Sequence, residues 1–154
     1  MTGFVANSPA PAETDIENIA FFPAISPVDC RDVMRIDSSI TPARLRSALV
    51  SAMHDTNHDL KSWRAEQETA GHATLAAVPA DAIDGASINL TLYQRAVYNY
   101  AKAELTERYR DYDSTLNATQ RAEDLDETID QYRRQAMLAI RKLSGRQRTT
   151  VELI

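Results

Sequence analysis

The chain has few of the residues that build covalent, metal or phosphate sites. Its 154 residues include a single cysteine, Cys30, and four glycines, which excludes an internal disulfide and leaves no glycine-rich phosphate loop. No apolar run reaches the roughly 18 residues that a membrane-spanning helix needs. The N-terminus also lacks the basic start and apolar stretch of a signal peptide. These absences predict a protein without membrane anchorage that matures in a reducing cytoplasm.

Basic charge is also in short supply. The 17 Lys and Arg residues face 22 Asp and Glu residues, for a net charge of −5, whereas a protein whose affinity rests on neutralising phosphates would be basic. Hydrophobic residues make up 44% and charged residues 25% of the chain, which is ordinary for a globular domain with its own core. We therefore expect one compact domain with short arms and no non-specific nucleic-acid binding.

The two ends of the chain are typical of extended segments. Residues 1–25 hold three prolines and three acids but no basic residue, which predicts an arm. Its apolar pair Phe21 and Phe22 must be buried, either on the chain's own domain or on a neighbouring subunit. At the other end, residues 146–154 predict a strand without a partner in the same chain, a template for pairing with another chain. A tail that folds back on the bundle, or frays, is the alternative.

Between these arms, residues 26–145 predict an all-α bundle of one short and three long helices. Ser26-Pro27 and Thr41-Pro42 each supply an N-cap and a proline at the first helical position, so they start the short helix and the second helix. Apolar spacing carries the second helix on to a stop at Gly71. As one continuous helix it would run about 43 Å, so that one end would project from a domain of this size.

The third and fourth helices are predicted as an antiparallel pair. The third runs from residue 88 to about residue 112, and the fourth opens with Asn117 and Gln120 as a capping box and stops at Gly145. The fourth helix has the cleanest apolar stripe of the chain, at three- and four-residue steps typical of a bundle seam. The stripe consists of Leu125, Ile129, Tyr132, Ala136, Ile140 and Leu143.

The connector Val78–Ser87, between the second and third helices, makes strict demands on its backbone. Pro79 fixes its own φ angle, Asp84-Gly85 is a turn pair in which Gly85 is expected at positive φ, and Ser87 is a candidate N-cap. A loop specified at this many positions usually has a function. Whether this function is catalysis or binding depends on whether the neighbouring helices contain catalytic or metal-binding residues.

No catalytic, cofactor-binding or metal site is predicted. His54 and His58 have the i, i+4 spacing of helical zinc sites, but Asp55 replaces the glutamate of such motifs and no third ligand is placed, so an exposed polar face is favoured. Cys30 lies beside two aspartates, which would raise its pKa and discourage thiolate chemistry. An assembly or binding role fits this pattern better than catalysis.

Five segments taken together resemble the head completion protein of P2-like tailed bacteriophages. They occur in order from about residue 20 to Ile154, and the connector is the most specific of them. The arm up to about residue 18 lies outside the resemblance. The segments are Phe21-Phe-Pro23, Thr41-Pro-Ala-Arg-Leu-Arg46, Val78–Ser87, Glu107-Arg-Tyr-Arg110 and Asp126-x-x-Ile129-Asp130.

The resemblance implies a structural virion protein without catalytic residues or cofactors. Such a protein binds the portal vertex after DNA packaging, completes and seals the DNA-filled head, and forms an adaptor ring for tail attachment. The implied partners are the portal protein, further copies in a ring that is dodecameric by resemblance, and a tail-side neck or tail terminator protein. Packaged DNA would pass nearby without specific binding. The implied location is the virion neck below the portal, and the host cytoplasm during assembly.

Two other classes of function stay open at the level of sequence. A cytosolic helical adaptor or regulator unconnected with virions would share the same composition and the same empty motif search. A metal-dependent bundle enzyme would rest on His54 and His58 alone.

Two sets of residues are predicted to make contacts in the phage role. The tail is expected to bind the portal through Arg146, Arg148, Thr149, Thr150, Val151, Leu153 and Ile154. The candidates for contacts between subunits come from the arm and the connector and are Phe21, Phe22, Pro79, Asp81, Asp84 and Gly85.

Overall fold

Within the described residues the chain forms five α-helices and one small hairpin. The structure, a computed structural model, describes residues 13–110 and 118–145, with side chains for 13–108 and 128–145. Its mostly helical content confirms that part of the predicted fold class, but the described residues form five α-helices where four were predicted, and a hairpin that the apolar spacing did not indicate. In chain order the elements are α1 (Pro27–Met34), α2 (Pro42–Asp59), α3 (Lys61–Thr69), the 3-10 helix η1 (Leu75–Ala77), β1 (Ala82–Ile83), β2 (Ala86–Ser87), α4 (Ile88–Arg110) and α5 (Ala118–Leu143).

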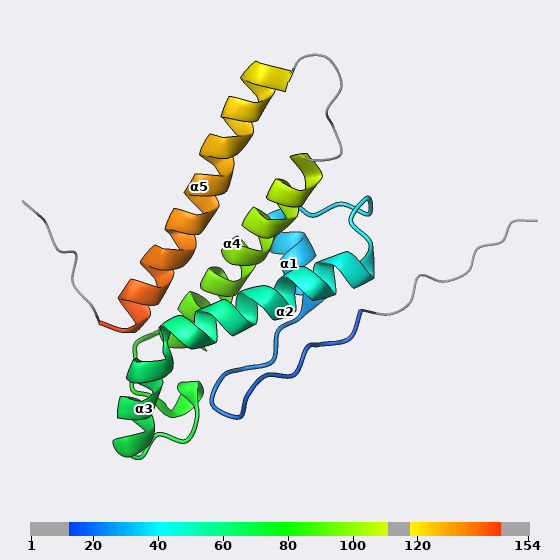
Figure 1. Ribbon diagram of the computed structural model, residues 1–154. Coiled ribbons are helices and arrows are strands. Elements are labelled where there is room, and N and C mark those ends of the chain that lie inside the picture. Colours follow the sequence, from blue (N-terminus) through cyan, green and yellow to red (C-terminus); the bar gives the residue numbers. More distant parts are fainter. Residues whose placement is uncertain (1–12, 111–117, 146–154) are drawn as a thin grey trace, which may run out of the picture.

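The central element is α4. Helix α5 runs antiparallel beside it, α2 crosses it, and α1 lies on a different side of α4 from α5 (Figure 1). Ala96 and Ala103 on α4 and Ala139 on α5 are buried, and such small side chains allow two helix backbones to approach closely. The long pair α4 and α5 therefore provides a rigid spine, with α1 and α2 packed against it.

The predicted seam of α5 is confirmed over its described part. Ile129, Ala136, Ile140 and Leu143 are buried and Tyr132 is half-buried, whereas Leu125 lies outside the residues with described side chains. The helix ends just before Gly145, which has a φ of 66°. The proposed capping box at Asn117 also lies outside the described residues.

The predicted starts of the first two helices are confirmed by their caps. Ser26 Oγ accepts a hydrogen bond from the Asp29 amide at 3.3 Å, and Thr41 Oγ1 accepts one from the Arg44 amide at 3.4 Å. Each bond satisfies one of the amides that a helix N-terminus leaves free.

The prediction of one continuous second helix is wrong, because the chain bends at Leu60. Leu60 has φ −91° and ψ 1° and is fully buried, and α3 turns away from α2 at this point (Figure 1). The bend brings the Trp63 ring edge-on to Phe21, with 6.2 Å between ring centroids. Apolar spacing did not reveal the break, because Leu60 and Trp63 continue the same stripe on both sides of it. The predicted stop at Gly71 is confirmed by its φ of 94°.

The described part of the N-terminal arm folds into the same core as the helices. Ile16 and Ile25 form an antiparallel bridge, with N···O distances of 2.8 and 3.0 Å, and both side chains are buried. The Leu75 amide of η1 donates to the Phe21 carbonyl at 2.8 Å. These contacts make residues 13–25 part of the packed domain.

Candidate functional site

The connector is a β-hairpin with an exposed tip. Ile83 pairs with Ala86 across a two-residue turn, in which Asp84 has a φ of 53° and Gly85 a φ of 73°. Positive φ at both central positions is the type I′ arrangement that Asp-Gly favours, because its twist matches that of the two strands. The predicted positive φ of Gly85 is confirmed. The Asp-Gly pair was the sequence signal for a hairpin, although the strands beside it are only two residues long.

Both ends of the hairpin are fixed to the helical core. Val78 is buried, and the buried Asn89 of α4 donates through its Nδ2 to the Val78 carbonyl at 3.5 Å. The Ile88 amide donates to the Asp81 carbonyl at 3.0 Å. Because these anchors lie next to the first turn of α4, the tip has a defined position relative to the spine.

The tip combines an apolar side chain with carboxylates. Ile83 is 67% exposed, and Pro79, Asp81 and Asp84 are exposed with it. An apolar anchor inside a polar rim is the composition of a protein contact surface. Ile83 lies within residues 79–86, the part of the connector predicted to face a neighbouring subunit or the ring channel, but it was not named individually as a contact residue.

Ser87 takes the predicted position but not the predicted role. Helix α4 begins directly after it, yet its Oγ is buried with no hydrogen-bond partner in the described part of the chain. Ser87 pairs with Ala82 in the hairpin, and its carbonyl accepts from Thr91 Oγ1 at 3.4 Å. At this helix start, backbone pairing in the hairpin, including the bond from the Ile88 amide to the Asp81 carbonyl, thus takes the place of a side-chain N-cap.

Phe21 and Phe22 are not available to a neighbouring subunit, because both rings are buried within this chain. Phe22 stacks on Tyr93 with 4.6 Å between ring centroids and 11° between ring planes. Phe21 packs edge-on against Phe22 at 5.1 Å. The structure thus agrees with the alternative in which the two phenylalanines pack on their own domain. The remaining candidates for contacts between subunits are the connector residues.

A polar network that the sequence did not predict holds the arm against α2 and α4. Asn18 Nδ2 donates to Tyr93 Oη at 2.8 Å, Tyr93 Oη donates to Asn57 Oδ1 at 2.6 Å, and Asn57 Nδ2 donates to Asn18 Oδ1 at 2.9 Å. Burial raises the pKa of Tyr93 to about 12, so the phenol stays protonated and able to donate. No local spacing relates these three residues.

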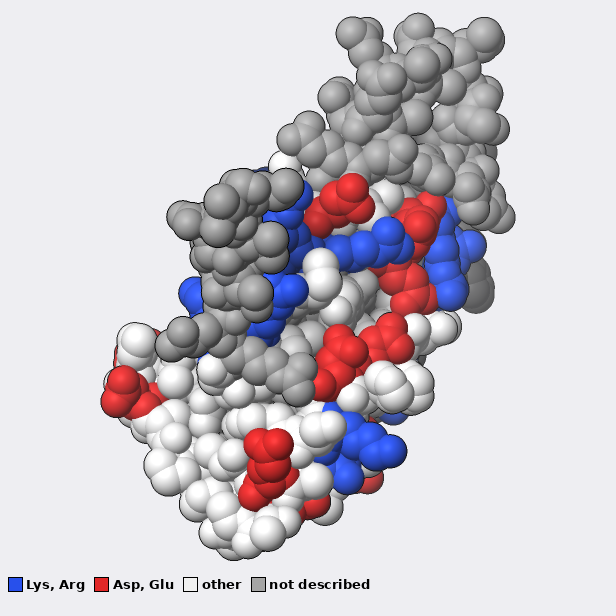
Figure 2. Space-filling model, turned by 60° about the vertical axis from the view of Figure 1, so that its left-hand side comes forward, with Lys and Arg blue, Asp and Glu red and all other residues white. Residues whose placement is uncertain are grey.

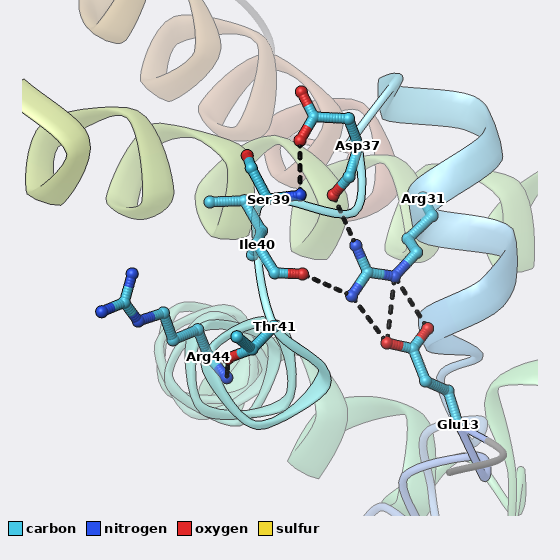
Figure 3. A network of polar contacts seen from close by, with 7 residues as sticks. All are labelled: Glu13, Arg31, Asp37, Ser39, Ile40, Thr41 and Arg44. Atoms are coloured by element: carbon cyan, nitrogen blue, oxygen red, sulfur yellow. Dashed lines mark hydrogen bonds and ion pairs between the residues drawn. The ribbon is translucent and has the colours of Figure 1, made fainter. Parts of the chain in front are cut away.

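A second network, around Arg31, ties the arm to α1 and to the loop before α2 (Figure 3). Arg31 binds the Glu13 carboxylate through Nε and Nη2 at 2.7 to 3.0 Å. Its Nη1 donates to the Asp37 carbonyl at 2.9 Å and its Nη2 to the Ile40 carbonyl at 2.8 Å. The hydrogen bonds from Arg31 lower the pKa of Glu13 below its ordinary value. One guanidinium therefore joins three segments of the chain.

The side chains that could have supported chemistry lie apart. His54 and His58 are exposed and stack with 6.5 Å between ring centroids, and the described residues hold no group of three or more His, Cys, Asp or Glu that could bind a metal. Burial raises the pKa of Cys30 to about 12. The direction of this shift was predicted, but its main cause is the apolar core, since Asp29 and Asp32 point to solvent.

Two further predictions from the sequence concern the tail and the membrane. The predicted portal-binding residues 146–154 lie outside the described residues. Among the helices that are described, none is both long enough and apolar enough to cross a membrane.

Comparison with known proteins gives one consistent picture. The family described as phage head completion protein (GPL) matches residues 16–154. The chain is 41% identical over 150 residues to the head completion/stabilization protein of Escherichia phage P2, an alignment that covers 97% of this chain and 89% of that relative. No solved structure matches the chain. The matched region includes α1 to α5, the connector and the tail.

Proposed function

We propose a function for this chain from its family, because the chain belongs to the phage head completion proteins. In this proposal it is a structural virion protein that binds the portal vertex after DNA packaging, completes and seals the DNA-filled head, and forms the adaptor ring for tail attachment. It acts by binding and not by catalysis. Its place is the virion neck, and the host cytoplasm before assembly.

The observation that carries this proposal is 41% identity, over almost the whole chain, to a protein named for head completion and stabilization. The structure is compatible with it in two ways. The spine of α4 and α5, with α1 and α2 packed on it, provides a rigid subunit for an assembly. A net charge of −5 suits a conduit for DNA, because a basic lining would bind phosphates and hold the DNA back.

The connector tip is the proposed contact with a neighbouring subunit or with the ring channel. Ile83 would be its apolar anchor, with Pro79, Asp81 and Asp84 around it, and Gly85 would set the turn. The tail from Arg146 to Ile154 is the proposed portal contact, since its alternating β-branched sequence favours pairing with a strand of another chain. A tail-side neck or tail terminator protein would bind the opposite surface of the ring.

The alternative of a cytosolic adaptor unconnected with virions has no observation in its favour beyond helical composition. Family membership, which depends on the ordered match over residues 16–154, supports the virion role instead. A metal-dependent enzyme has only the exposed pair His54 and His58.

Complementation of the phage that encodes this chain tests the proposal. With its own gene disrupted, the phage should package DNA but yield heads whose DNA becomes sensitive to DNase, and no infectious particles. Supplying the chain from a plasmid should restore protected DNA and phage yield. Normal yield without the chain would contradict a role in head completion.

A further inference from the structure

The outer face of α5 carries unpaired cations around an exposed methionine. Arg134, Met137 and Arg141 recur at three- and four-residue steps and therefore form one stripe, which Asp130 begins one turn earlier. Met137 is 45% exposed, and both arginines are exposed. Neither guanidinium group has an ion pair or hydrogen bond in the described part of the chain. The two arginines of the stripe therefore have no partner among the residues with described side chains.

Two basic side chains near this stripe differ from it, because each already contacts a side chain of the same subunit. Arg133 Nη2 lies 2.7 Å from Glu107 Oε2, and Arg95 Nη2 donates to Gln135 Oε1 at 2.6 Å. Figure 2, which brings the α5 side of the molecule forward, shows Lys and Arg side chains next to Asp and Glu side chains on this face. Within residues 13–108 and 128–145, Arg134 and Arg141 are thus cations without a compensating carboxylate.

The exposed face of α1 has the opposite charge and the same apolar character. Asp29, Asp32 and Val33 lie within one turn of the helix, where Val33 is 66% exposed and both aspartates are exposed. Neither carboxylate has a partner among the residues that the structure describes. Ser26 uses only the amide of Asp29 for its cap. The face therefore offers two free carboxylates next to an exposed valine.

The two faces cannot meet within one subunit, because α1 and α5 lie on different sides of α4 (Figure 1). The two guanidinium groups are opposite in charge to the two carboxylates, and Met137 and Val33 give each face an exposed apolar side chain. Complementary charge of this kind fixes orientation and register between partners. Two different patches that complement each other make a heterologous contact, which generates a ring when the rotation closes.

We infer that the α5 stripe of one copy (Arg134, Met137, Arg141) docks on the α1 face of a second copy (Asp29, Asp32, Val33). This inference rests on the proposed function, because in a closed ring every subunit has one neighbour on its α5 stripe and another on its α1 face. It adds which surfaces of neighbouring subunits meet, and it leaves the connector tip free for the channel side or for a further contact.

Site-directed cross-linking in assembled particles tests the contact. Val33→Cys and Met137→Cys are introduced together into the plasmid-borne chain of the complementation experiment, and particles are oxidised mildly and run on a non-reducing gel. A ladder of disulfide-linked copies is expected from the double variant. Each single variant should give monomers only, because Cys30 is fully buried. A dimer from one single variant would show a contact of like with like and overturn the inference.

Charge exchange gives a second readout. Asp32→Arg and Arg141→Asp should each lower the phage yield at least about tenfold, since each places like charges together, and the double variant should recover most of the loss. Both positions are exposed, so the isolated variants should stay folded, with a small loss of thermal stability for Arg141→Asp because it places an anion in the last turn of α5. Full activity of both single variants, or no recovery in the double variant, would overturn the contact.

The parent chain separates failure of the contact from failure of the function. If it restores phage yield while neither the cross-link nor the recovery occurs, the proposed interface is wrong and the proposed function stands. If the parent chain does not restore yield, the proposed function and the interface that rests on it both fall.

Discussion

At the scale of single residues, Arg31 and Tyr93 do most to attach the arm to the helices. Arg31 joins Glu13 to the carbonyls of Asp37 and Ile40, and Tyr93 joins Asn18 to Asn57. The fully buried Tyr93 hydroxyl stabilises the fold only because its partners are present, since a buried polar group without a partner would cost roughly 1 to 3 kcal/mol; Arg31 and Glu13 are half-buried. Both residues thus make the arm depend on the bundle.

The Glu13–Arg31 pair predicts a specific pH dependence of stability. The pKa of Glu13 is lowered in the folded chain, so its contribution is fully present above the ordinary glutamate pKa of about 4.3 and is lost as the pH falls through the folded-state value. Glu13→Gln should therefore lower the free energy of unfolding at pH 7 and reduce its loss between pH 5 and 3.

Denaturant unfolding at several pH values measures this effect. The matched control is Glu17→Gln, because Glu17 is exposed and has no partner in the described part of the chain. Equal acid sensitivity of Glu13→Gln and the parent chain would contradict the role given to this pair.

At the scale of elements, most helix ends and turns are set by the residue types at those positions, whereas the uninterrupted length of a helix is not. The caps at Ser26 and Thr41 and the stops at Gly71 and Gly145 lie where their residue types predict. The break at Leu60 has no comparable local signal, because it serves the packing of Trp63 on Phe21. The hairpin is intermediate: its turn was predictable from Asp84-Gly85, but its strands were too short to show alternation.

The turn at Gly85 gives a prediction at this scale. At a φ of 73° a β-branched side chain is strained, although no atom lies within 4 Å of the position that a Cβ would occupy. Gly85→Val should cost on the order of 1 to 2 kcal/mol, confined to the hairpin. Gly85→Asn should cost less, because asparagine tolerates positive φ.

Hydrogen exchange of the hairpin amides, with phage yield in the complementation experiment, separates the two variants. Loss of protection and yield for Gly85→Val, and near-parent values for Gly85→Asn, are expected. Normal yield with a disturbed hairpin would contradict a contact at the connector tip, and an undisturbed hairpin would contradict the strain argument.

At the scale of the whole molecule, one rigid spine carries several separate surfaces. The connector tip, the α1 face and the outer stripe of α5 lie on different parts of the subunit (Figure 1). An assembly protein needs such separate surfaces, because each neighbour must bind without displacing another.

Removal of the tail tests its proposed role at this scale. Deletion of residues 146–154 should abolish binding to the portal protein and leave the helical circular dichroism unchanged, because the described core ends before them. Pull-down with purified portal measures the binding. A tail of the same composition in scrambled order is the control, and full binding by the truncated chain would refute the assignment.

Local stretches of sequence were enough to predict the helix starts at Ser26 and Thr41, the stops at Gly71 and Gly145 and the positive φ of Gly85. They also predicted the buried face of α5 and, through the resemblance, the family. The structural features among these depend on residues within about one helical turn or across one tight turn, so short segments contain the necessary information.

Long-range packing, in contrast, set where the arm goes, where the second helix bends and which charges remain free. Asn18 and Tyr93 bond across 75 positions of the chain, and no periodicity relates residues that far apart. The burial of Phe21 and Phe22 depends likewise on Trp63 and Tyr93. Whether an arginine forms an ion pair depends on which side chains the tertiary structure places within hydrogen-bond distance of it. In this structure Arg134 and Arg141 face outward from α5.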